Sequence, residues 1–173
     1  MRVFFTLTLL SSFALSQVIL PTSFSASFKQ SVTNPKKKKI NYSGTMRFSK
    51  KNGIKWIYSK PTKKDVCSDK IRLVVVDHDL EQVSYYKLNN AINLEKIVQK
   101  AQLVRKNVYT AKYDGQYYTL QVDSKGTILR VAYKDNLDND GLIIFSKTKY
   151  STKERSKKSL ECKIPKAYDI VDG

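Results

Sequence analysis

The sequence predicts a mainly β, single-domain protein in which about eleven antiparallel strands form one curled sheet and a short helix covers its open mouth. Three observations predict this class. Short segments alternate apolar and polar residues, turn residues separate them closely, and one interruption has helical spacing. Alternation is typical of strands that bury one face, and short connections are typical of an antiparallel meander. Sheets with many strands curl or close, so a lone amphipathic helix has its most economical place over the mouth.

The first residues have the pattern of an export signal. In MRVFFTLTLLSSFALSQ, the charge of Arg2 precedes an apolar run that ends in small residues spaced as a cleavage site. A membrane anchor is the alternative, but the apolar run is shorter than the roughly 20 residues of a spanning helix, and serine and threonine interrupt it. We expect residues 1–16 to be a signal peptide that is cleaved, and residues 17–173 to form the mature domain.

The first three predicted strands alternate most clearly. They are TSFSASFKQSVT (22–33), INYSGTMRFSK (40–50) and GIKWIYS (53–59). Successive side chains of a strand point to opposite faces. The apolar side chains expected on the buried face are Phe24, Phe28, Met46, Phe48, Ile54, Trp56 and Tyr58. Lys55, which has the opposite parity, is expected to face water.

Eight further segments have strand character and are separated by turn residues. They are 65–68, 71–77, 80–88, 107–113, 116–122, 127–133, 142–150 and 160–164. The interruption is NNAINLEKIVQKAQ (89–102), in which Ile97 and Val98 belong to an apolar stripe and Asn90 is a suitable cap. We expect a lid helix near 90–102.

The formal net charge of +17 comes mostly from lysine. Such a charge is compatible with nucleic acid, acidic lipid headgroups, an acidic partner protein or merely a solvated surface. Proteins that read bases and phosphates rely on arginine and on clustered motifs, which this sequence lacks. We therefore expect no nucleic-acid partner, and the charge leaves the other possibilities open.

Catalysis, metal and cofactor sites find little support in the sequence. Its single histidine, His78, lies in the turn DHD, and catalytic or phosphate-binding motifs are absent. NLDNDG (136–141) resembles the start of a calcium loop, but Lys147 occupies the position of the bidentate glutamate. Cys67 and Cys162 form no metal-ligand spacing. In an exported chain they favour a disulfide, with two unpaired thiols as the alternative.

Four sequence segments resemble those of a known family: ASFKQSVT, YSGTMRFSKKNGIKWIYSKP, VCSDK and DLEQVSYYKL. In this order they resemble the periplasmic outer-membrane lipoprotein carrier family, LolA. The resemblance implies an incomplete, unclosed antiparallel β-barrel of about eleven strands with a helical lid, whose interior holds acyl chains. The candidate cavity residues are then Phe24, Phe28, Met46, Phe48, Ile54, Trp56, Tyr58, Ile97 and Val98. Alternatively, Trp56 is a packed core residue that touches no ligand.

The resemblance also implies a function. A periplasmic chaperone of this family binds the acyl chains of lipoproteins that an inner-membrane export complex releases, and it carries them to an outer-membrane receptor. It implies a monomer that is not an enzyme and that needs no cofactor or metal. A lipid-anchored receptor of the same fold needs a cysteine directly after the signal, yet the first cysteine is Cys67. A periplasmic sensor or binding domain that acts through its basic surface, without enclosing lipid, remains the alternative.

Two departures from the family pattern concern the lid. The family has a helix before its first strand, whereas only residues 17–21 precede the first strand here. The family's arginine six residues before the tryptophan, which pins the closed lid through hydrogen bonds, falls on Lys50. A lysine lacks the planar fork of arginine. Lys50 is therefore the candidate lid latch, and an exposed turn lysine is the alternative reading.

Overall fold

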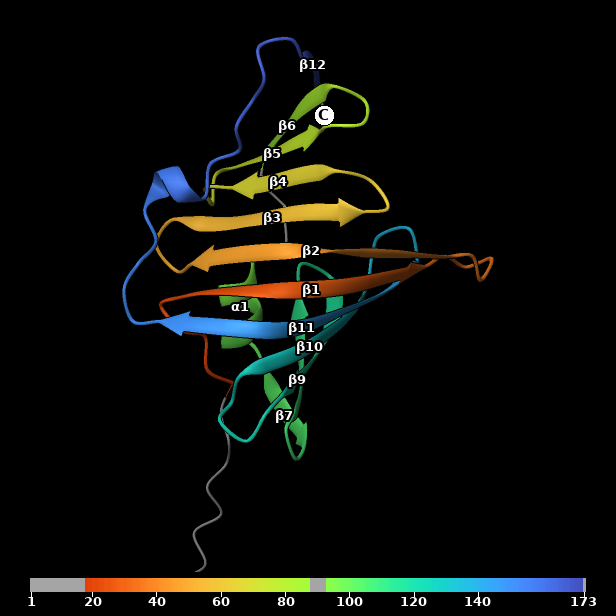
Figure 1. Ribbon diagram of the computed structural model, residues 1–173. Helices are drawn as coiled ribbons and strands as arrows, with labels where there is room; N and C mark the ends of the chain where they lie inside the picture. The colour runs from red at the N-terminus through yellow and green to blue at the C-terminus, as the bar shows by residue number, and fades with distance from the viewer. Residues whose placement is uncertain (1–17, 88–92, 173) are drawn as a thin grey trace, which may run out of the picture.

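The computed structural model describes residues 18–87 and 93–172, which form one twelve-stranded sheet. The strand order is β12-β6-β5-β4-β3-β2-β1-β11-β10-β9-β8-β7 (Figure 1). All neighbours pair antiparallel except β12 and β6. Since β12 and β7 remain at opposite edges, the sheet is an unclosed barrel, as the sequence predicts. Within the described residues, no helix has the length and apolar character needed to cross a bilayer.

The strands follow the alternating segments of the sequence. Their bounds are β1 Ser23–Thr33, β2 Lys39–Ser49, β3 Gly53–Lys60, β4 Lys64–Ser68, β5 Arg72–Asp77, β6 Gln82–Lys87, β7 Gln102–Arg105, β8 Val108–Tyr113, β9 Gln116–Val122, β10 Ile128–Lys134, β11 Asp140–Ser151 and β12 Asp169–Asp172. The helical elements are α1 Leu94–Gln99 and the single 3-10 turn η1 Lys157–Ser159.

The hydrophobic core lies on one face of the sheet, which we call the inner face. Cross-strand pairing places Met46 beside Trp56 on this face, with Phe28, Gly44 and Tyr58 in the next row. Glycine is required at position 44, since a Cβ there would lie 1.9 Å from the Ile57 carbonyl oxygen. The ring of Phe28 occupies the space beside it.

The helix α1 lies against the inner face (Figure 1) and is shorter than the sequence predicts. It begins after Asn93, whose side-chain Oδ1 accepts a hydrogen bond from the Lys96 amide at 3.0 Å. The predicted cap Asn90 lies outside the described residues. At the other end the helix stops at Gln99 and β7 begins at Gln102, so the last three residues of the predicted helix are not helical.

Two short parts of the sequence prediction are wrong. Residues 160–164 are not a strand, because they follow η1 and cross the outer face of the sheet, whose side chains include Arg47, Lys55 and Cys67. β12 was not predicted, and it pairs parallel with β6 instead, with Ile170 beside Val83. Four residues are too few for alternation to be recognised.

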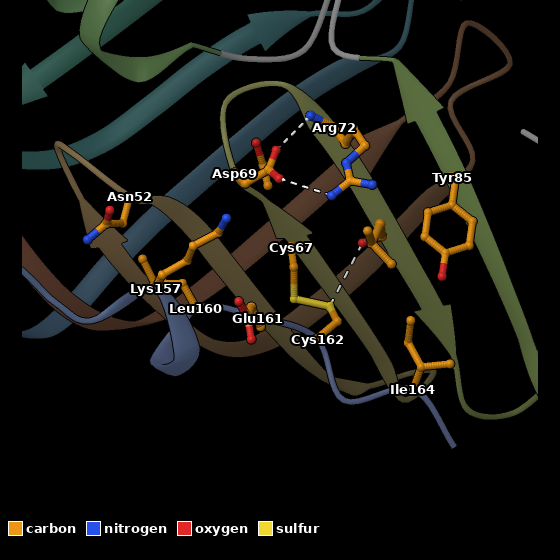
Figure 2. Close-up of a pocket in the computed structure, with 12 residues that line it drawn as sticks. Asn52, Cys67, Asp69, Arg72, Tyr85, Lys157, Leu160, Glu161, Cys162 and Ile164 are labelled. Carbon is orange, nitrogen blue, oxygen red and sulfur yellow. Dashed lines mark hydrogen bonds and ion pairs between the residues drawn. A yellow bond between two sulfur atoms is a disulfide. The ribbon is translucent and has the colours of Figure 1, made fainter. Parts of the chain in front are cut away.

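Lys55 does not face water, contrary to the expectation from its parity. Its residue is only 7% exposed, because residues 157–164 cover that part of the outer face. The ammonium Nζ lies 3.0 Å from Asp65 Oδ2 and donates to the Glu161 carbonyl oxygen at 3.0 Å. These two interactions stabilise the ammonium charge, whose burial without partners would be energetically unfavourable. A disulfide between Cys67 and Cys162 ties the same C-terminal stretch to β4 (Figure 2).

Candidate functional site

A cavity of about 340 Å³ lies on the inner face beneath α1. Its walls come from β1 to β5, from α1 and from β10 and β11. The lining residues are Gln30, Met46, Ile54, Trp56, Tyr58, Val66, Ser68, Leu73, Leu94, Ile97, Val131, Tyr133, Ile143 and Phe145. Most of these side chains are apolar, so the cavity suits a hydrocarbon ligand.

Five of the nine cavity residues expected from the sequence line this space. They are Met46, Ile54, Trp56, Tyr58 and Ile97. The other four, Phe24, Phe28, Phe48 and Val98, belong to the packing around it. Phe28 packs behind the cavity wall: the centroid of its ring lies 4.8 Å from that of Trp56 and 5.0 Å from that of Tyr58. Phe24 and Phe48 pack on each other at 5.2 Å.

Trp56 lies on the cavity wall and also packs against the core. Its indole meets the ring of Phe28 edge-on, and its centroid lies 6.1 Å from that of Phe145. The residue is only partly buried, in contrast to Phe28. An indole so placed has one side held by protein and another available to the contents of the cavity.

The sequence interpretation missed the far wall of the cavity. Val131 and Tyr133 of β10, and Ile143 and Phe145 of β11, complete the lining. The alternation within 127–133 and 142–150 is enough to assign these four side chains to one face of the sheet. It is not enough to predict that they lie across the cavity from Trp56. Such a placement depends on how far the sheet curls, which local patterns do not encode.

A polar chain crosses one part of the cavity lining. The Tyr58 hydroxyl donates to Gln30 Oε1 at 3.1 Å, and Gln30 Nε2 donates to the Tyr133 hydroxyl oxygen at 2.7 Å. Burial, together with neighbouring tyrosines, raises the pKa of Tyr58 far above its usual value. Burial likewise raises the pKa of Tyr133. Both hydroxyls therefore keep their protons at neutral pH.

The helix α1 is held over the cavity by apolar and ionic contacts. Ile97 is fully buried, and Leu94 and Ile97 both line the cavity. Glu95 lies between two lysines from different turns, 3.8 Å from Lys50 Nζ and 3.4 Å from Lys70 Nζ. Lys50 thus reaches α1 through a carboxylate, and no carbonyl partner for its ammonium is recorded among the described residues.

The cavity is small for a complete lipid anchor. A methylene needs about as much room as a water molecule, about 30 Å³, so this space admits on the order of ten methylenes. That is about the size of one acyl chain. The inner face continues beyond the cavity, however, because Leu73 pairs with Tyr86 of β6, which is exposed.

A second hollow, of about 320 Å³, lies on the outer face between β4 to β6, the turn before β3 and the C-terminal stretch (Figure 2). Charged side chains of Asp69, Arg72, Lys157 and Glu161 line it beside the disulfide. Partial burial acts to raise the pKa of Asp69, but hydrogen bonds from the Arg72 and Ile71 amides outweigh it, so the pKa lies below its usual value. A lining with this many charges suits hydrocarbon poorly.

The histidine of the chain lines neither hollow. His78 lies in the turn after β5, where Nε2 is 3.8 Å from Asp65 and Nδ1 is 3.1 Å from the Tyr168 hydroxyl. Among residues 18–87 and 93–172, no three His, Cys, Asp or Glu side chains are grouped to hold a metal ion. What the inner cavity offers is enclosure of apolar groups.

Comparisons with known proteins agree along most of the chain. A family model described as "Outer membrane lipoprotein carrier protein LolA" matches residues 21–107. The outer-membrane lipoprotein carrier protein of Campylobacter jejuni is 36% identical over 149 residues, which is 86% of each chain. That of Wolinella succinogenes is 28% identical over 123 residues, covering 71% of this chain and 72% of the relative.

Solved structures support the fold. An uncharacterized conserved protein from Thermus thermophilus superposes with a TM-score of 0.55 at 9% identity, covering 89% of this chain and 92% of the other. A LolA superfamily protein from Nitrosomonas europaea superposes with a TM-score of 0.52 at 11% identity, covering 86% of this chain and 94% of the other. At such identities the likeness concerns the fold alone.

Proposed function

The chain belongs to the LolA family of outer membrane lipoprotein carrier proteins, and we propose that it carries lipoproteins by enclosing their acyl chains in the inner-face cavity beneath α1. The observation that carries this proposal is the cavity itself: an apolar space covered by a helix of six residues. The function is binding and release, not catalysis, and it needs no cofactor.

The energy of acyl chains in water explains why such a carrier encloses its cargo. Each buried methylene contributes about 0.8 kcal/mol, so a chain of about fifteen methylenes costs on the order of 12 kcal/mol to expose. Free diffusion between two membranes is therefore negligible. A cavity that replaces water by the side chains of Ile54, Trp56 and Ile143 removes much of this cost.

Loading requires that α1 moves away from the sheet. The cavity has room for about one chain, and a lipoprotein anchor has more than one. The ion pairs of Glu95 with Lys50 and Lys70 oppose this movement, but both lysines are substantially exposed. Exposed pairs contribute only about 0.2–1 kcal/mol each. The lid is thus weakly latched, and Lys50 belongs to the latch.

The direction of transport comes from partners, because the chain has no nucleotide site in its motifs. In this proposal residues 1–16 direct export and are removed, and the mature monomer works in the periplasm. An inner-membrane lipoprotein export complex loads it with lipoproteins through their acylated N-termini. An outer-membrane lipoprotein receptor with greater affinity for the chains unloads it.

Affinity purification from a membrane extract, followed by mass spectrometry, tests the proposal. The expected result is co-purification of acylated lipoproteins. Ile143→Trp fills the cavity and should abolish this, whereas Ile144→Trp, on the outer face of the same strand, should not. If lipoproteins are absent with the wild type, or if both variants retain them, the chain acts without enclosing lipid, as the basic-surface alternative holds.

A further inference from the structure

The hydrogen-bonded chain in the cavity ends in an unused donor. Tyr58 donates to Gln30, and Gln30 donates to the Tyr133 hydroxyl oxygen, so the proton of Tyr133 remains free. No acceptor for that proton is recorded among the described residues. Since Tyr133 lines the cavity, its hydroxyl is available to donate this proton to a group that the cavity holds.

The position of the Tyr133 ring is fixed by its surroundings. It lies against the backbone of Gly141, where a Cβ would come within 2.2 Å of the ring carbon Cζ. The ring of Tyr118 stacks on it with centroids 6.4 Å apart, and Gln30 holds the hydroxyl. The donor is therefore preorganised, which lowers the cost of using it to bind a ligand.

An apolar cavity whose wall carries the Tyr133 donor matches a particular ligand chemistry. Burying a hydroxyl whose proton has no partner is unfavourable, and a pure hydrocarbon would leave it unpaired. A carbonyl oxygen accepts such a proton. Acyl chains carry one carbonyl each, at the ester or amide bond that joins them to glycerol or to an amine.

We propose that the Tyr133 hydroxyl donates a hydrogen bond to the carbonyl oxygen of a bound acyl chain, so that the cavity prefers ester- or amide-linked chains over ether-linked alkyl chains of equal length. This inference rests on the proposed function. A neutral hydrogen bond made in the complex strengthens binding about 2- to 12-fold.

The test uses two diacylated lipopeptides that differ only in ester or ether linkage of their chains. Dissociation constants are measured from the emission of Trp56, the protein's single tryptophan, which lines the same cavity. The wild type should bind the ester form about 2- to 12-fold more tightly. Tyr133→Phe should bind both forms equally, and Gly141→Ala, which displaces the ring, should reduce the preference.

The matched control is Tyr118→Phe, because this tyrosine stacks on Tyr133 without joining the hydrogen-bonded chain. It should keep the preference for the ester. Equal binding of both lipopeptides by the wild type overturns the inference but leaves the proposed function standing. Retention of the preference in Tyr133→Phe also overturns it. If the wild type binds neither lipopeptide, the proposed function fails and the inference fails with it.

Discussion

Replacing Ile97 with alanine is expected to release α1 from the sheet while leaving the sheet folded. The helix has six residues, too few to be stable alone, so its position depends on tertiary contacts. Ile97 is its fully buried side chain. Ile97→Ala removes three carbon groups, or about 2.4 kcal/mol at about 0.8 kcal/mol each. At about 1.4 kcal/mol for each factor of ten, docking of the lid weakens about 50-fold.

Hydrogen exchange of backbone amides measures this change. The amides of Ile97 and Lys100, bonded to the carbonyls of Asn93 and Lys96, should lose about 50-fold in protection. Amides of β1 and β2 should keep theirs. Ile143→Ala is the control, since it makes the same change on the opposite wall within β11 and should lower protection throughout the sheet. If Ile97→Ala lowers the protection of β1 and β2 as much as that of α1, the helix is part of the core and not a separable lid.

Three further predictions concern the latch, the disulfide and a buried hydroxyl. Lys50→Leu removes an ion pair with Glu95 and adds apolar surface, so in a reconstituted assay lipoprotein loading should persist while onward transfer slows. Lys51→Leu should behave as wild type. If Lys51→Leu slows transfer and Lys50→Leu does not, the latch is Lys51. Reduction of the Cys67–Cys162 disulfide, which spans 95 residues, should lower stability by about 4.7 kcal/mol and the melting temperature by about 10–20 °C in calorimetry. An unchanged melting temperature with both thiols titrated would refute a stabilising bridge. Tyr109→Phe removes a buried hydroxyl that has no hydrogen-bond partner in the described part of the chain, and burying such a group costs about 1 kcal/mol or more. The variant should therefore unfold at a higher urea concentration. A lower midpoint would mean that the hydroxyl has a hydrogen-bond partner.

The alternating strands were predictable because each is a local pattern. Phe24 and Phe28 alternate with serines, and Ile54, Trp56 and Tyr58 alternate with polar residues, so parity alone assigns their face. The same patterns place Met46, Ile54, Trp56 and Tyr58 on the inner face, but they place Phe24, Phe28 and Phe48 there as well. Parity therefore predicts the face of a side chain and not whether it lines the cavity.

What could not be predicted depends on contacts between distant segments. Lys55 has the parity of a solvated residue, and only the return of residues 157–164 across the outer face buries it. β12 forms because it meets β6 more than 80 residues away, not because its own sequence favours a strand. Gln30 is polar and is not among the cavity residues that the sequence predicts, yet Tyr58 and Tyr133 give it hydrogen-bond partners there. A polar side chain is expected at the surface only where the fold provides no hydrogen-bond partner for it inside.

The most direct test of acyl-chain enclosure is quenching of Trp56 fluorescence by a nitroxide-labelled lipopeptide. The label is placed either in the middle of one acyl chain or at the far end of the peptide, at equal degrees of binding. Because Trp56 lies on the cavity wall, the label in the acyl chain should quench its emission strongly and the label on the peptide should quench it little. Equal quenching by both labels, or quenching by the peptide label alone, would contradict the enclosure of acyl chains on the inner face.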